Sequence, residues 1–230
     1  MSRRKMTKEE LEQDPLVQSV ERVQSFYDQF KNEVLIGAIA VVLIIAGGIG
    51  YYYYDQSQER QAQQLMGPAE TFFLNGDYQN ALQGSDEEFT VGFEQIINNY
   101  GGTDAGNLAR YYAAVCEYNL GNTETALSYM EEYEVPEGIM GVGPLSFKAV
   151  LHTELDQHEQ AAQTYVQAAE WDENESTTPY NYLEAAKAFY DAGDISRARE
   201  YANLVVNDYP NSTQVAEAER LIGTIAASGQ

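Results

Sequence analysis

Apolar and polar residues follow three different patterns along this chain, and the most distinct is an unbroken apolar run at residues 34–54. The run carries no charge between Glu33 and Asp55, and its 21 residues would form a helix about 31 Å long. A helix of that length spans the hydrocarbon core of a bilayer and satisfies its backbone hydrogen bonds internally. The alternatives are a buried core helix and a cleaved signal peptide. The run ends in Tyr51–Tyr54, which suit a membrane–water interface better than a cleavage site, so the pattern predicts an uncleaved transmembrane signal anchor.

A second pattern precedes this run. Apolar residues recur at alternating spacings of four and three, which predicts a helix that begins at Asp14-Pro15 and carries an apolar stripe on one face. The helix could lie on the membrane surface or against a partner helix. The stripe consists of Leu16, Val20, Val23, Tyr27, Phe30 and Val34.

Basic residues gather on the N-terminal side of the apolar run. Residues 1–33 contain six of the 13 Lys and Arg residues, whereas only Arg60 lies between residues 55 and 109. Because the cytoplasmic flanks of membrane segments are enriched in basic residues, we expect the tail 1–33 in the cytoplasm and residues 55–230 on the far side of the membrane.

The third pattern is a helical repeat after residue 55. Four Gly- or Asp-containing turns are each followed five residues later by an alanine, and a second alanine lies twelve residues before the first. Small side chains at matching positions allow two antiparallel helices to cross closely. The spacings between repeats are 45, 35 and 37 residues, and the first requires an insertion, which we place at the polar stretch 84–88. The alanine pairs are Ala69 and Ala81, Ala114 and Ala126, Ala149 and Ala161, and Ala186 and Ala198.

This repeat resembles the tetratricopeptide repeat (TPR) over residues 68–227, with Asp156 in place of a usual turn glycine. The resemblance implies an all-α fold: a single N-terminal transmembrane helix followed by a TPR-like α-solenoid. The expected parts are a cytoplasmic tail with an amphipathic juxtamembrane helix at 1–33, the anchor at 34–54, and an exported domain at 55–230. That domain would hold about four helical hairpins and a C-terminal capping helix. The glycine-rich stretch 138–144 is expected to be a loop between repeats.

The whole layout is similar to the YfgM-type ancillary subunits of the bacterial Sec translocon, as found in the Bacteroidota. This resemblance implies an adaptor beside the translocon at the inner membrane, with translocon subunits, periplasmic chaperones and exported clients as partners. The alternative is a TPR scaffold for another envelope complex, such as outer-membrane assembly or cell-division machinery. The stretches that carry the resemblance are Gly92-Phe93, residues 98–103, residues 106–112 and Thr178-Pro179-Tyr180.

TPR solenoids bind peptides on a concave face formed by the first helix of each repeat. Aromatic and apolar residues in register with the alanines are candidates for this groove, although the inter-repeat core is the other interpretation of the same positions. The candidates are Phe73, Tyr111, Tyr118, Leu183 and Tyr190.

The net charge of residues 55–230 excludes some classes of ligand. Residues 55–230 contain seven Lys or Arg against 29 Asp or Glu, a formal charge of −22. This charge argues against nucleic acid and anionic lipid headgroups as ligands of the domain. It leaves two interpretations, a surface adapted to high salt and a receptor for basic partners, and the scatter of the acids favours the first.

No group of residues predicts catalysis, so we expect neither an enzyme nor a cofactor or small-molecule substrate. His152 and His158 are six residues apart, and a helical metal site would need a spacing of three or four. The single cysteine, Cys116, lies in an apolar stretch and is expected to be a buried, unreactive thiol.

Overall fold

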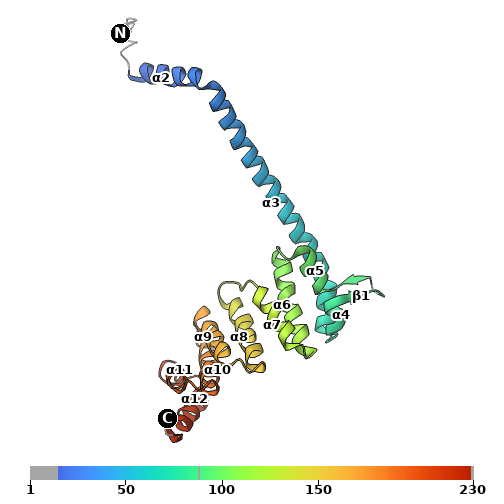
Figure 1. Ribbon diagram of the computed structural model, residues 1–230, viewed down its shortest axis with the longest axis vertical. Helices are drawn as coiled ribbons and strands as arrows, with labels where there is room; N and C mark the ends of the chain where they lie inside the picture. Colours follow the sequence, from blue (N-terminus) through green and yellow to red (C-terminus); the bar gives the residue numbers. More distant parts are fainter. Residues whose placement is uncertain (1–14, 88, 229–230) are drawn as a thin grey trace, which may run out of the picture. The chain divides into compact units, whose positions relative to one another are not determined.

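The computed structural model describes residues 15–87 and 89–228, and almost all of its regular structure is helical (Figure 1). The chain divides into two compact units, Met1–Ser57 and Gln58–Gln230, which are treated separately below. The predicted helix start at Asp14 and the basic residues at 3–8 lie outside the described residues, as do the side chains of Leu16 and Val20.

The first unit contains helix α2 (Pro15–Gln29) and the beginning of helix α3 (Lys31–Leu74). Helix α3 is long and apolar enough to cross a membrane, and none of its most apolar stretch is buried. The helix does not end with the apolar run. It continues for another twenty residues, from Asp55 to Leu74, so the apolar run and the first helix of the second unit are one element.

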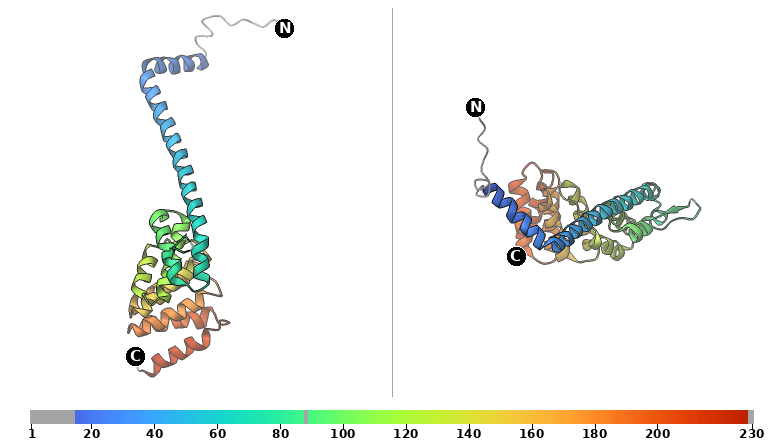
Figure 2. Two further views of the ribbon diagram at one scale, coloured as in Figure 1. Left: turned by 90° about the vertical axis from the view of Figure 1, so that its right-hand side faces the viewer. Right: turned by 90° about the horizontal axis from the view of Figure 1, so that it is seen from above.

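The second unit is a series of helical hairpins in which successive helices pack against one another (Figure 2). The predicted all-α architecture, an apolar N-terminal helix followed by a TPR-like solenoid, is confirmed. The helices after α3 are α4 (Tyr78–Gln83), α5 (Phe93–Tyr100), α6 (Asp104–Asn119), α7 (Thr123–Glu132), α8 (Ile139–Glu154), α9 (His158–Trp171), α10 (Thr178–Asp191), α11 (Ile195–Asp208) and α12 (Val215–Ala227).

The turn of each hairpin contains one residue with a left-handed backbone conformation. Gly76, Gly121 and Gly193 have φ of 75°, 85° and 82°, and Asp156 occupies the equivalent position with φ of 57°. Aspartate tolerates this conformation better than most residues because its short polar side chain can bond locally. The departure from a turn glycine at Asp156 therefore leaves the hairpin geometry unchanged.

The repeated alanines lie deep inside the second unit. Each of the four pairs contributes one alanine to each helix of a hairpin, and the pairs belong to α3/α4, α6/α7, α8/α9 and α10/α11. All eight have no exposed surface, which agrees with a need for small side chains where paired helices cross.

The extra residues of the first repeat form a hairpin between α4 and α5. Strand β1 (Gly84–Ser85) pairs antiparallel with strand β2 (Thr90–Val91). Two glycines close the neck of this hairpin, because a Cβ on Gly92 would lie 2.1 Å from the Leu82 carbonyl oxygen and one on Gly84 would lie 2.3 Å from that of Thr90. The hairpin therefore leaves and re-enters the helical layer at nearly the same point.

The predicted loop at 138–144 is wrong, because α8 begins at Ile139 and runs through Pro144. Packing overrides the weak helix propensity of this stretch, since Val142 and Leu145 are both buried. Gly141 allows the backbone of α8 to lie close to Trp171 and Pro136. A Cβ at this position would lie 2.2 Å from Nε1 of Trp171 and 2.3 Å from the Pro136 carbonyl oxygen.

Candidate functional site

A groove lies between α3 and α6, the first helices of the first two repeats. Its volume is about 330 Å³, which is within the range of ligand pockets. Met66 and Ala105, both 5% exposed, form apolar parts of its wall. The groove is lined by Glu59, Gln63, Met66, Gly67 and Glu70 from α3 and by Asp104, Ala105 and Leu108 from α6.

Hydrogen bonds hold one wall of this groove in place. Oε2 of Glu59 accepts from the backbone N–H of Ala105 at 3.2 Å, so an acid from α3 satisfies a free N–H in the first turn of α6. Oε1 of Glu59 accepts from Nε2 of Gln63 at 2.7 Å. The first turn of α6 is also capped by Thr103, whose Oγ1 accepts from the N–H of Gly106 at 3.0 Å.

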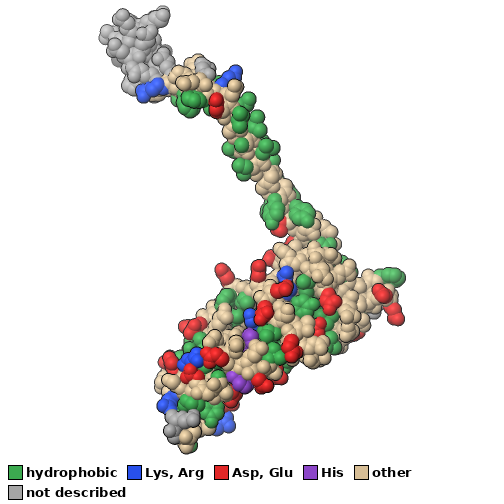
Figure 3. Space-filling view, in the orientation of Figure 1, with side chains coloured by type: hydrophobic (Ala, Val, Ile, Leu, Met, Phe, Trp, Pro, Cys, Tyr) green, Lys and Arg blue, Asp and Glu red, His purple; other side chains and the backbone are tan. Residues whose placement is uncertain are grey.

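The groove combines an apolar wall with the carboxylates of Glu59, Glu70 and Asp104. This arrangement suits a Lys or Arg side chain, whose methylene stem can pack on Met66 while its charge meets the carboxylates. Acidic side chains are also scattered over the repeats on the face shown in Figure 3. The groove therefore favours basic over acidic ligands.

The aromatic groove candidates of the first two repeats lie in clusters between helices. The ring of Phe73 is 4.9 Å from that of Tyr112 and 6.4 Å from that of Phe93. Tyr111 and Tyr118 both contact the ring of Phe147 on α8, at 6.1 Å and 5.6 Å between centroids. These three candidates are partly buried and join neighbouring repeats.

The remaining candidates also pack against the core. Leu183 is 1% exposed, which leaves almost no surface for a peptide, and Tyr190 packs against the cluster around Phe189. The structure thus brings none of the five candidates into the groove between α3 and α6. The groove residues of α3 recur at helical spacing, which is visible in the sequence. Their position beside Asp104 and Leu108 depends on tertiary packing, which the sequence does not show.

The glycine-rich stretch 98–106 forms the corner between α5 and α6. A Cβ on Gly106 would lie 2.0 Å from the Tyr100 carbonyl oxygen, so the two helices meet where only glycine fits. Nη1 of Arg110 donates to the carbonyl of Gly101 at 2.7 Å and fixes the corner to α6. This stretch therefore positions α6 beside α3.

The Thr178-Pro179-Tyr180 stretch begins α10 and contributes to a buried polar network. Oγ1 of Thr178 donates to the carbonyl of Ala169 at 3.1 Å and accepts from the N–H of Asn174 at 2.9 Å. Asn181, 1% exposed, accepts from Oγ of Ser146 at 2.7 Å. The network ties α8, α9 and α10 together.

Cys116 and His152, two of the side chains considered for chemistry in the sequence, are both buried. Burial, followed by the charge of Glu117, raises the pKa of Cys116 to about 12, so its thiol stays protonated at neutral pH. Nδ1 of His152 shares a 2.7 Å hydrogen bond with Oε1 of Gln157. Within 15–87 and 89–228, no three His, Cys, Asp or Glu side chains are placed to hold a metal ion.

Two family profiles match this sequence. One, described as a tetratricopeptide repeat-like domain, matches residues 24–134, and another, described as a tetratricopeptide repeat, matches residues 180–212. The two matches fall on the first and last parts of the helical region and support a TPR protein. The first TPR match begins within α2 and includes the whole apolar run, so the run and the first repeats fall in one matched stretch.

Solved TPR-like repeats provide structural comparisons. Two crystal structures of nearly identical TPR-like repeats, assigned to a putative kinesin light chain of Podosopora anserina, resemble the chain with a TM-score of 0.48. One of them, a variant form, is 15% identical and covers 75% of this chain and 92% of its own. The other is 16% identical, with coverages of 76% and 96%. No curated protein matches the chain.

TPR domains generally bind proteins or peptides and are typically non-catalytic scaffolds. The two TPR matches therefore suggest a protein-interaction scaffold. Its groove between α3 and α6 offers polar and apolar contacts but contains no nucleophile–base pair.

Proposed function

We propose that this protein is a membrane-anchored TPR adaptor at the bacterial cell envelope. Residues 34–54 cross the inner membrane, the tail 1–33 lies in the cytoplasm, and the domain 55–230 lies in the periplasm. The observation that carries the proposal is the apolar part of α3, where a long stretch has no buried residue and continues directly into the repeats. Such a surface is stable in lipid and not in water.

The proposed partners are translocon subunits near the membrane and chaperones or exported clients in the groove between α3 and α6. Emerging chains expose mixed apolar and basic segments, which fit an apolar wall edged by Glu59, Glu70 and Asp104. The TPR-like profile matches the apolar run together with the first repeats, which supports an adaptor in which the anchor and the repeats are joined. YfgM-type subunits remain the resemblance on which this role rests.

Site-specific photo-crosslinking in cells tests the role. A photoreactive residue at Ile44 samples the span, one at Leu108 (39% exposed) samples the groove, and one at the exposed Asn211 is the control. We expect translocon subunits from Ile44, and chaperones or exported proteins from Leu108 but not from Asn211. Recovery only of outer-membrane assembly or cell-division proteins would support the alternative envelope scaffold and contradict the translocon role.

We also propose that the acidic surface is mainly an adaptation to salt. At about 0.1 M salt the Debye length is near 10 Å, so neighbouring carboxylates still repel, whereas at about 1 M it is near 3 Å. The isolated domain should therefore melt at a higher temperature in molar KCl than in dilute buffer. A melting temperature that is flat with salt, together with a basic peptide that binds only at low salt, would instead identify the acids as a recognition surface.

A further inference from the structure

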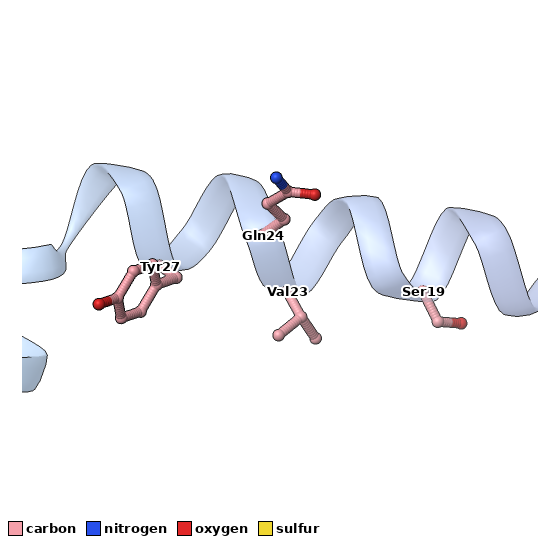
Figure 4. A pocket seen from close by; sticks show the side chains of 4 residues that line it. All are labelled: Ser19, Val23, Gln24 and Tyr27. Atoms are coloured by element: carbon pink, nitrogen blue, oxygen red, sulfur yellow. The ribbon is translucent and has the colours of Figure 1, made fainter.

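Helix α2 presents an apolar side that no described residue covers. The large apolar side chains on this side are exposed, at 69% for Val23, 58% for Phe26 and 48% for Tyr27, and Phe30, which directly follows α2, is 38% exposed. Figure 4 shows Val23 and Tyr27 on the same side of the helix, together with Ser19, and Gln24 lines the edge of the same surface. A helix with this division of side chains needs an apolar surface against one face.

The chain changes direction where α2 meets α3. Helix α2 ends at Gln29 and α3 begins at Lys31, and Figures 1 and 2 show that the two helix axes do not continue one another. The N–H of Phe30 donates to the carbonyl of Phe26 at 2.9 Å, and the N–H of Val34 donates to that of Phe30 at 2.9 Å. The chain therefore changes direction with these two N–H groups still hydrogen-bonded within the backbone.

We propose that α2 is an interfacial helix that lies on the bilayer, with Val23, Phe26, Tyr27 and Phe30 inserted at the boundary between headgroups and acyl chains. This inference rests on the proposed anchor in α3, because that anchor brings α2 to the membrane surface. Aromatic side chains prefer this boundary, and the rings of Phe26 and Phe30 pack 4.9 Å apart.

The spacing of aromatic residues along the chain fits one membrane thickness. Tyr51–Tyr54, all more than 60% exposed, lie at the other end of the apolar run. The helical rise from Phe30 to Tyr52 is about 33 Å, close to the hydrocarbon thickness of about 30 Å. Two aromatic groups thus bracket the span, and the N-terminal one belongs largely to α2.

A second copy of the chain fits the same face less well. Helix α2 has 15 residues, about two heptads, and such short helices associate weakly in water. Aromatic Tyr27 and Phe30 occupy positions where dimeric coiled coils prefer Ile, Val and Leu. The membrane interface can accommodate these aromatic rings without complementary side chains from a second helix.

Lipid charge should contribute little to this contact. Residues 15–33 hold Arg22 and Lys31 against Glu21, Asp28 and Glu33, a formal charge of −1. Burial of the apolar side chains therefore drives the contact, and a neutral membrane suffices. This expectation separates an apolar interfacial helix from a basic one, which would require anionic lipid.

Fluorescence quenching in the full-length protein tests the proposal. Bimane is attached to single cysteines in three variants, Val23→Cys, Ser25→Cys and Ile44→Cys, reconstituted into phosphatidylcholine vesicles with and without phosphatidylglycerol. The native Cys116 stays unlabelled because it is buried. Ser25 is the matched control, since a rotation of about 100° per residue places it on the side opposite Val23. Nitroxide lipids in both leaflets and aqueous iodide serve as the two quenchers.

We expect shallow nitroxides to quench the Val23 probe several-fold more than the Ser25 probe, equally in both vesicle types, and deep nitroxides to quench the Ile44 probe. Deep quenching at Ile44 with equal iodide access at Val23 and Ser25 would overturn the interfacial helix and leave the anchor intact. Efficient crosslinking between Val23→Cys copies at high lipid dilution would also overturn it, in favour of a second copy. Iodide access at Ile44 would instead contradict the anchor itself.

Discussion

The two parts of α3 have the same backbone and opposite surroundings. Along residues 34–54 the side chains are exposed, whereas along residues 58–74 the helix buries Ala62, Met66 and Ala69 in the core of the first repeat. The first part is uniformly apolar, and the second is polar with a small apolar stripe. Both parts form the same helix, so the difference lies in which faces are apolar: one stripe that packs on the repeats in the second part, and the whole surface in the first part, for which we propose lipid.

The largest expected effect compares two alanines of this one helix. Ala69→Leu adds three carbons where no surface is exposed, and overpacking of this kind should lower the free energy of unfolding of the repeats by about 3 kcal/mol. Ala46→Leu makes the same change at an exposed position of the apolar run and should leave the repeats unaffected. Thermal unfolding of the full chain in detergent measures both. Equal losses would contradict the distinction between the two parts of α3.

Two glycines of α8 allow a similar comparison of a buried and an open position within the repeats. Gly141→Ala places a methyl group against Trp171 and the Pro136 carbonyl and should destabilise by about 2 kcal/mol. Gly143→Ala meets no atom within 4 Å and should stabilise by about 0.5–1 kcal/mol through helix propensity. Urea unfolding of both variants provides the test. If both substitutions stabilise, then Gly141 does not act through close packing.

The repeat framework was readable from the sequence because it depends on local features. The eight alanines, the turn residues and the uncharged run at 34–54 each have a spacing or length that implies one structure. The start of α8 could not be predicted from the sequence, since its glycines and Pro144 disfavour a helix, and the packing of Gly141 against Trp171 is visible only in the structure. The sequence did not predict the groove between α3 and α6 for a similar reason. Aromatic residues such as Tyr111 pack between repeats, and nothing in the sequence distinguishes Glu59 and Asp104 from the other acids, because they come together only when α3 packs beside α6.

The smallest expected effect concerns an acid on α5. Burial, followed by the charge of Glu117, raises the pKa of Glu94 above its ordinary value of 4.5. Because its charged form is disfavoured in the folded state, Glu94 destabilises the repeats at neutral pH, and this penalty disappears as pH falls through the raised pKa. Glu94→Gln should therefore raise the melting temperature at neutral pH, and the gain should vanish once the pH falls below the ordinary carboxyl range. A gain that persists in acid would show that charge burial is not its cause.

The most direct test of the membrane-anchored account measures topology. Single cysteines are placed in the full chain at exposed positions on either side of the apolar run, Ser25→Cys and Asn211→Cys, with the buried Cys116 as a silent background. Bacterial spheroplasts that express each variant are treated with a membrane-impermeant maleimide. The account predicts that the thiol at position 211 reacts in intact spheroplasts and that the thiol at position 25 reacts only after the membrane is permeabilised. Reaction at position 25 alone, or at both positions in intact spheroplasts, would contradict it.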